Sequence, residues 1–207
     1  MTYMKKKIKD LAIKKTAHWR RKKLVATDFT IISNNCWAGD VYRYFGLPYQ
    51  TPTVGMYFFA DEYIRFCNNL PHYLTTPIEP LDFCDSKYQK ELEQKGQTKK
   101  LLAHLDDVEI VLLHYTSWDE AREKWERRAK RVNFDRLIVK NSRQNGCTNE
   151  NIEDFLKMPH KILFLDNHPS EHPNVVYISG YEHEKYLLDD ISTYRKHMDI
   201  LKFLNEG

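Results

Sequence analysis

Three polar loops of this 207-residue sequence hold most of the side chains that could do chemistry. Each loop follows an apolar run suited to a buried strand, at residues 29–32, 108–114 and 136–139. The polar side chains are Asn34, Asn35, Cys36 and Asp40 in the first loop, His114, Tyr115 and Thr116 in the second, and Asn141, Ser142, Arg143, Asn145 and Thr148 in the third. Ligands of parallel α/β folds bind beyond the carboxyl ends of the strands. We therefore expect the three loops to meet at one site.

Cys36 is the sharpest single candidate for catalysis. It lies in a predicted strand-to-helix turn, where a helix N-terminus can lower the pKa of a thiol and favour the nucleophilic thiolate. His114 would act as its general base, with Asp40 or an asparagine of the turn as the orienting group. The competing interpretation is structural, because unpaired cysteines are often buried and asparagine-rich turns often cap helix donors.

An arginine cluster marks the helix predicted over residues 117–132. Ser117 and Glu120 have the spacing of a capping box. The apolar stripe at helical spacing, with both tryptophans predicted to face inward, is Trp118, Ala121, Trp125, Ala129 and Val132. Arginines bunch at the end of the helix, at Arg127, Arg128 and Arg131, and their guanidinium groups suit phosphate or carboxylate. The cluster is therefore either a binding site for an anionic substrate such as a nucleotide-sugar or a solvated, salt-bridged face.

Other motifs are weaker. Thr148 and Asn149 are candidate caps of a helix whose N-terminal N–H groups could hold phosphate. His168, His172 and His183 lack metal-ligand spacing, and the four cysteines form no CxxC pair, so we predict no metal site. Neither a P-loop nor GxGxxG is present, and the cofactor stays unknown.

The elements that must position these side chains alternate between short β-rich runs and longer helical patterns. Further strands are predicted at residues 161–165 and 175–178, with helices at 117–132 and 149–158 and a final helix or pair of helices over 184–204. Such alternation is typical of an α/β fold with three layers, a mostly parallel sheet and helices on both faces.

The first third of the sequence is less regular and could add an antiparallel edge or a small subdomain. An extended run is predicted at residues 53–59, helices at 60–70 and 88–94, and a polar loop at 96–100. Cys67 lies on the apolar side of the first of these helices, where we expect it in the core.

The N-terminal residues form a separate, basic unit. Residues 1–23 hold ten Lys or Arg and one Asp, a net charge of +9, so the remainder, with 22 basic and 28 acidic residues, carries −6. We expect a basic arm or helix at 1–23, with helical pattern over 4–24, and a single α/β domain at 24–207. The arm either contacts a membrane surface peripherally or is a solvated helix, and charge confined to one arm does not indicate a nucleic-acid binder.

Several absences indicate a cytoplasmic protein. No stretch has the apolar core of a signal peptide, and no apolar run reaches the roughly 20 residues of a membrane span. The scattered cysteines are typical of reduced thiols.

The stretch ISNNCWAGDVYRYFGLPYQTPTVGMYF resembles the signature segment of a bacterial family associated with exopolysaccharide biosynthesis and catalogued as domain of unknown function nineteen-nineteen. The resemblance continues through FCNNLPHYL, HYTSWDEAREKWERRAKRVN and GCTNENIEDF to YRKHMDILKFLN. Family-like positions include Asn34, Asn35, Cys36, Trp37, Gly39, Tyr42, Arg43, Pro52, Thr53, Gly55, His114, Tyr115, Trp125, Arg128, Arg131, Asn133, Gly146 and Cys147. Asn145 stands where the family tends to have an acidic residue, which argues against a metal- or base-type role there.

The resemblance implies a cytoplasmic protein used in making capsular or extracellular polysaccharide. We expect a glycosyl- or acyltransferase that acts on an activated sugar or a polysaccharide intermediate, with Cys36, His114 and Asp40 as catalytic residues. The expected binding residues for a sugar-containing or nucleotide-sugar ligand are Asn34, Asn35, Trp37, Tyr115, Arg128, Arg131, Arg143 and Thr148. The alternative is a non-catalytic protein that binds carbohydrate or a partner, since tryptophan and tyrosine near a polar crevice would also suit sugar stacking.

Overall fold

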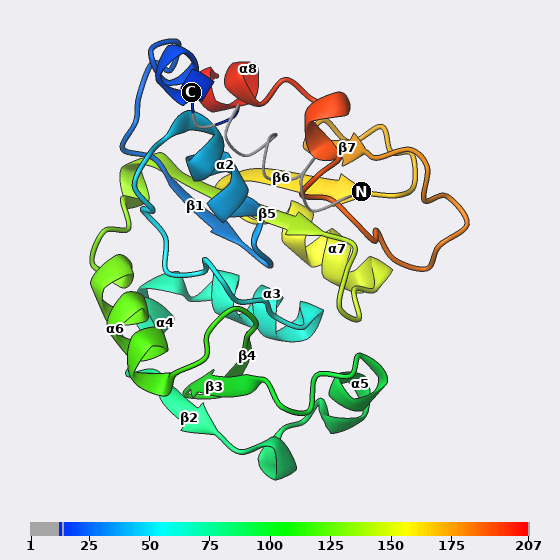
Figure 1. Cartoon of the computed structure of the whole chain (residues 1–207). Coiled ribbons are helices and arrows are strands. Elements are labelled where there is room, and N and C mark those ends of the chain that lie inside the picture. The colour runs from blue at the N-terminus through cyan, green and yellow to red at the C-terminus, as the bar shows by residue number, and fades with distance from the viewer. Residues whose placement is uncertain (1–12, 14, 207) are drawn as a thin grey trace.

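The computed structural model describes all residues except 1–12, 14 and 207, and it folds around two β-sheets (Figure 1). The larger sheet has four parallel strands in the order β1-β5-β6-β7, at Thr30–Ser33, Leu137–Ser142, Lys161–Asp166 and Val175–Tyr177. The predicted α/β class with a parallel sheet is therefore confirmed.

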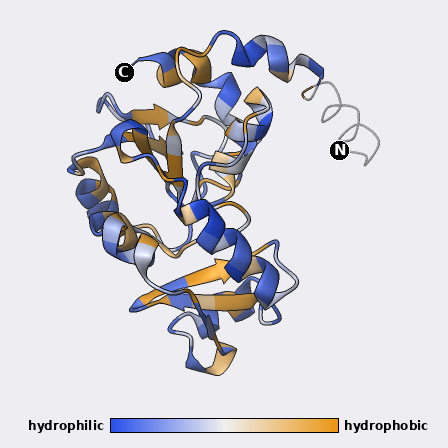
Figure 2. Ribbon diagram, turned by 90° about the vertical axis from the view of Figure 1, so that its left-hand side faces the viewer, coloured by the Kyte–Doolittle hydropathy of each residue, from blue (hydrophilic) through white to orange (hydrophobic). Residues whose placement is uncertain are grey.

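Helices cover both faces of the parallel sheet, because its strands are apolar on both sides. On one face, alternate strand residues such as Ile31 pack with α2 (Trp37–Phe45) and α8 (Ile200–Asn205). On the other face, their neighbours such as Ile32 pack with α3 (Ala60–Asn68) and α7 (Asn149–Leu156). The strands of both sheets are mostly hydrophobic (Figure 2).

The smaller sheet is antiparallel and consists of β2 (Glu79–Leu81), β3 (Leu101–Leu105) and β4 (Val108–Leu112). Helix α3 shares one core cluster with β3, β4 and the parallel sheet, and so joins the two sheets. The strand predicted at 108–114 thus exists but is not parallel, and the expectation that its loop opens at the parallel edge is wrong. The sequence did not indicate β2 and β3 because the first is short and contains Pro80 and the second, LLAHL, has no β-branched residue.

Three other predicted elements differ from the structure. Residues 52–55 form a turn, and of the extended run at 53–59 only Tyr57 bridges Val111. Residues 184–204 are mostly irregular before the 3₁₀-helix η3 (Tyr194–Lys196) and α8; the Leu187 N–H donates to the Arg143 carbonyl just after β5, and Asp190 bonds to Lys140 of that strand. Strand β5 continues to Ser142, since Asn141 and Ser142 pair with β6.

The remaining predicted helices are confirmed with small shifts. They are α3, α5 (Gln89–Gln94), α6 (Trp118–Ala129) and α7, to which the structure adds α4 (Leu70–Thr75) and the 3₁₀-helices η1 (Phe83–Asp85) and η2 (Phe134–Arg136). The Ser117 side chain accepts from the Glu120 N–H at the start of α6, and Trp125 is buried below this helix. Cys67 is buried in the core, as expected.

The N-terminal helix is described in part. Residue 13 and residues 15–21 are helical, and the rest of the prediction before residue 13 lies outside the described residues. None of the helices in the described part of the chain has the length and apolar character that crossing a bilayer requires.

Candidate functional site

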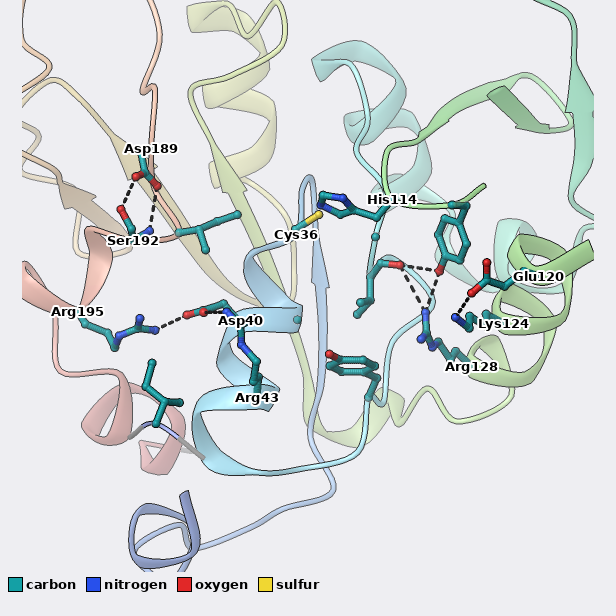
Figure 3. Close-up of a pocket in the computed structure, with 17 residues that line it drawn as sticks. Cys36, Asp40, Arg43, His114, Glu120, Lys124, Arg128, Asp189, Ser192 and Arg195 are labelled. Atoms are coloured by element: carbon teal, nitrogen blue, oxygen red, sulfur yellow. Dashed lines mark hydrogen bonds and ion pairs between the residues drawn. The ribbon is translucent and has the colours of Figure 1, made fainter. Parts of the chain in front are cut away.

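A cavity of about 560 Å³ lies between α2, the residues after β4, α6 and residues 189–195 (Figure 3). It gathers five of the predicted site residues, which are Cys36, Asp40, His114, Tyr115 and Arg128. The loop after β5 does not reach this cavity. The loop that holds His114 and Tyr115 follows β4 of the antiparallel sheet, whereas the loop that holds Cys36 follows β1 of the parallel sheet. Their meeting at the cavity therefore depends on α3, which joins the two sheets.

Cys36 and His114 are held against the same loop. The Cys36 Sγ lies 3.8 Å from the Met56 carbonyl oxygen, and the His114 backbone N–H donates to the Gly55 carbonyl at 2.9 Å. Figure 3 shows the His114 ring and the Cys36 sulfur projecting toward one another at the cavity. Both side chains therefore line one cavity, and the hydrogen bond of the Cys36 sulfur goes to the Met56 carbonyl.

The Cys36 thiol is not activated by the helix that it begins. Its side chain caps no N–H of α2. Burial raises the pKa of the Cys36 thiol, with the Asp190 carboxylate acting in the same direction and the Lys140 ammonium opposing it. The direction is opposite to the lowered pKa that the turn position predicts, because burial disfavours the charged thiolate.

Gly55 allows the backbone of the loop between α2 and α3 to lie close to the Tyr115 ring. It has a φ of +86°, and a Cβ at this position would lie 3.0 Å from the Tyr115 ring. A side chain here would strain the backbone and push Tyr115 away from the cavity. The loop between α2 and α3 therefore fixes both His114 and Tyr115.

Asp40 of α2 forms salt bridges with two arginines. Its carboxylate accepts from Arg43 at 2.7 Å, from Arg195, and from the Tyr194 hydroxyl at 3.2 Å. Arg43 lies on α2 itself, and Tyr194 and Arg195 lie on the C-terminal segment, so the hydrogen bonds of this carboxylate are directed away from His114. Its predicted orienting role is wrong, and its position instead holds two arginines along one wall.

A buried ion pair lies below the cavity. Lys140 of β5 and Asp190 form a salt bridge, and both are fully buried. The Lys140 ammonium also donates to the Oδ1 atoms of Asn34 and Asn35 at 3.2 and 3.3 Å, and to the Ser142 hydroxyl at 3.2 Å. Burial lowers the pKa of Lys140, opposed by the Asp190 carboxylate. We call this group of five residues the floor network.

The floor network explains the two predicted asparagines. The Asn35 Oδ1 accepts from the Trp37 N–H at 3.0 Å, which caps α2, and its Nδ2 donates to Asp190 at 2.9 Å. Asn34 is 2% exposed and bonds to Ser142. Both side chains support the cavity from below, and neither lines it.

Arg128 lines the opposite wall and is 7% exposed. Its guanidinium donates to the Tyr115 hydroxyl at 2.9 Å and to the Val54 carbonyl at 3.4 Å, and lies 5.1 Å from the centre of the Tyr49 ring. Among the described residues no carboxylate lies within ion-pair distance of it. Lys124, one helical turn earlier, pairs with Glu120 beside it.

The other predicted binding residues lie elsewhere. Arg131 is exposed and donates to the Tyr49 carbonyl at 3.2 Å. Arg143 forms an ion pair with Asp166 at 2.6 Å, and Thr148 caps α7 through its hydroxyl. Trp37 is fully buried against Tyr194. None of these four lines the cavity, so their convergence with Cys36 is a prediction that the structure contradicts.

Several residues of the site were missed in the sequence. Lys140 directly follows the strand predicted at 136–139, and a lysine that continues an apolar run buried on both faces is a signal for a buried ion pair. Asp190 and Arg195 were assigned to a helix, and nothing in their spacing marks them. No group of three or more His, Cys, Asp or Glu that could hold a metal ion occurs among the described residues.

Comparisons with known proteins place the chain in one family. A family model described as "Domain of unknown function (DUF1919)" matches residues 6–205. An uncharacterized protein of Haemophilus influenzae is 29% identical over 173 residues, which cover 82% of this chain and 77% of that protein. Neither description states an activity.

Proposed function

Because this chain belongs to the DUF1919 family, which has no described activity, we propose from the pocket itself that it is a transferase acting on an activated, phosphate-bearing sugar. The proposed setting is the biosynthesis of exopolysaccharide or capsule in the cytoplasm. The family resemblance of the segment around Cys36 supports the setting, and the four unpaired cysteines suit a reducing compartment.

The observation that carries this proposal is the environment of Arg128. A buried cation is costly unless it is paired, yet the described groups around this guanidinium are a hydroxyl, a carbonyl and an aromatic ring. Its position in the cavity wall leaves it open to an anion, and guanidinium groups bind phosphate in a bidentate manner. Tyr49, on the same wall, offers a ring face for a sugar or a base.

The side chains of the cavity favour acyl transfer over glycosyl transfer. Asp40 and Glu120 are both bound to cations, and Asp189 accepts from Ser192. Of the described nucleophiles that line the cavity, we propose Cys36 with His114 as its base, because a thiol is more nucleophilic than the Ser192 hydroxyl, which donates to Asp189. Because burial raises the pKa of the Cys36 thiol, the attack needs a group that accepts its proton, and we assign this role to His114.

The proposed reaction has two balanced halves. The Cys36 Sγ attacks the carbonyl carbon of an acyl donor, His114 accepts the thiol proton, and the donor's leaving group departs with that proton. A hydroxyl of the sugar then attacks the thioester, gives its proton to His114, and releases the thiol, which recovers the proton. The phosphate of the sugar is held by Arg128.

One observation favours a second function, a non-catalytic protein that binds the same sugar ligand. The Cys36 sulfur contacts the Met56 carbonyl, and burial keeps the thiol in its neutral form. This function uses Arg128 and the tyrosines alone and makes no demand on Cys36.

Binding is tested by calorimetry with a panel of nucleoside diphosphate sugars, sugar phosphates and the uncharged sugars. We expect binding of a phosphate-bearing compound and a loss of ten- to a hundredfold in Arg128→Met, because charge-assisted hydrogen bonds contribute about 1.5–3 kcal/mol. Arg131→Met is the matched control and should bind like wild type. Equal binding by all three proteins would overturn the proposal.

Catalysis is tested by incubation with an acyl thioester and mass spectrometry of the intact protein. We expect an acyl adduct on Cys36 that is lost in Cys36→Ser and reduced in His114→Ala. Absence of the adduct, with ligand binding retained in Cys36→Ser, would select the non-catalytic function.

A further inference from the structure

We propose that the N-terminal helical segment binds the surface of a membrane that contains anionic lipids. The binding face consists of Lys15, His18, Trp19 and Lys22, extended by Lys23 and Val25, and we call it the basic-aromatic face. The inference is independent of the function of the cavity.

The helix has two sides that differ in burial. Ile13, Ala17 and Arg20, spaced by four and three residues, are buried or partly buried on the side that faces the body. Lys15, His18, Trp19 and Lys22 repeat at the same helical spacing and are all exposed. The basic-aromatic face therefore points away from the fold.

The exposed apolar side chains distinguish this face from an ordinary solvated helix. Trp19 is 66% exposed and Val25 is 80% exposed, and both belong to the few large hydrophobic residues that are exposed. The Lys22 ammonium lies 5.5 Å from the centre of the Trp19 ring. Tryptophan beside lysine is suited to the interface between lipid headgroups and acyl chains.

The charge of the segment selects anionic lipid. From residue 11 to residue 27 the sequence has six Lys or Arg and no Asp or Glu. Polyphosphate chains such as nucleic acid would be attracted by the same charge, but they offer no apolar phase for Trp19 and Val25. A lipid surface satisfies the cations and the apolar side chains together.

The face is held in place by the body of the protein. The Arg20 guanidinium donates to the Tyr44 carbonyl at 2.8 Å and stacks 4.0 Å from the centre of the Tyr44 ring. The Asn205 amide of α8 accepts from the Val25 N–H and donates to the Lys23 carbonyl, both at 2.9 Å. The segment is therefore preorganised, and docking costs little chain entropy.

A hollow of about 500 Å³ beside this face offers room for a lipid headgroup. His18, Arg21 and Lys22 line one part of it, and Asp28 lines another. Asp28 is engaged by Arg136 at 3.4 Å. The three basic side chains are therefore those available to a headgroup phosphate.

The test is cosedimentation of the full chain with vesicles of phosphatidylcholine alone and with 30% phosphatidylglycerol. We expect binding to the anionic vesicles only. Lys22→Glu/Lys23→Glu should lower the partition coefficient by at least about thirtyfold, because each lost cation contributes roughly a factor of five and the two new carboxylates add repulsion. The control Lys90→Glu/Lys99→Glu makes the same charge change at exposed positions of the small-sheet region and should retain binding.

Fluorescence separates lipid docking from simple charge attraction. Anionic vesicles should shift the tryptophan emission to the blue in wild type and not in Trp19→Phe, because the other tryptophans are buried or partly buried. Equal loss in the two double variants would overturn the proposal. So would binding to a short RNA with no binding to the vesicles, or binding without a shift that depends on Trp19.

Discussion

The two walls of the cavity carry similar cations in different surroundings. On the α2 wall, Arg43 and Arg195 both bind the carboxylate of Asp40. On the α6 wall, Arg128 is more deeply buried and contacts neutral groups. The arginines of the α2 wall are thus paired with a carboxylate of the protein. Arg128 on the α6 wall has no carboxylate partner among the described residues. The difference separates arginines that bind a carboxylate of the protein itself from the arginine that we propose binds a ligand.

The floor network also pairs a cation with a carboxylate, and both groups are fully buried. Breaking this pair should lower the free energy of unfolding more than any other change considered below. Asp190→Ala leaves the Lys140 ammonium buried without a counter-charge, which should lower the free energy of unfolding by about 3–5 kcal/mol. Urea denaturation measures this loss. The neighbouring Asp189→Ala removes bonds to Ser192 alone and should cost less than about 1 kcal/mol. Equal losses of unfolding free energy in the two variants would show that the Lys140–Asp190 ion pair does not account for the effect.

The same arginine-to-methionine substitution should destabilise the protein on the α2 wall and not on the α6 wall. Arg195→Met removes a charged hydrogen bond from Asp40 and should lower the free energy of unfolding by about 1.5–3 kcal/mol. Arg128→Met removes a cation with no described counter-charge, so stability should be unchanged or raised while anion binding is lost. Urea denaturation of both variants without ligand checks this. A loss of stability in Arg128→Met as large as in Arg195→Met would remove the distinction between the walls.

Between the walls, the Cys36 thiol should react slowly at neutral pH. Its raised pKa lowers the thiolate fraction at any pH below that pKa, so alkylation should accelerate about tenfold per pH unit into the alkaline range. Iodoacetamide labelling followed by peptide mass spectrometry gives the rate. The exposed Cys84 in the same molecule is the internal control and should react first at pH 7. Faster labelling of Cys36 at that pH would indicate an activated thiolate.

Arg131 should give the smallest effect, because it is an exposed member of the same arginine cluster. Arg131→Ala removes a hydrogen bond to the Tyr49 carbonyl and should change the free energy of unfolding by no more than about 0.5 kcal/mol. Thermal unfolding measures it. A loss comparable to that of Arg195→Met would mean that Tyr49 depends on this bond for its place in the cavity wall.

The sequence predicted the position of the site better than it predicted the chemistry of the site. Periodicity predicts the strand before Cys36 and the helix that carries Arg128, whereas His114 reaches the cavity from an antiparallel sheet that the sequence does not indicate. The sequence could not show that β4 leaves the parallel sheet, because pairing between β3 and β4 is set by packing on α3. Nor could it separate Arg128 from Arg131, because they lie three residues apart at helical spacing and the sequence does not show that α6 ends at Ala129, before Arg131.

The long separation between β1 and β5 has a consequence for how the protein folds. Thr30 pairs with Leu137, more than a hundred residues later, and β1 has no other neighbour in its sheet. The chain entropy lost in closing this long loop is offset only after the two strands have paired, and this slows folding. The α7 unit between β5 and β6 is local and can form earlier. We therefore expect the β1–α2 junction, with Cys36, to be assembled in a late kinetic step, after most of the secondary structure is in place.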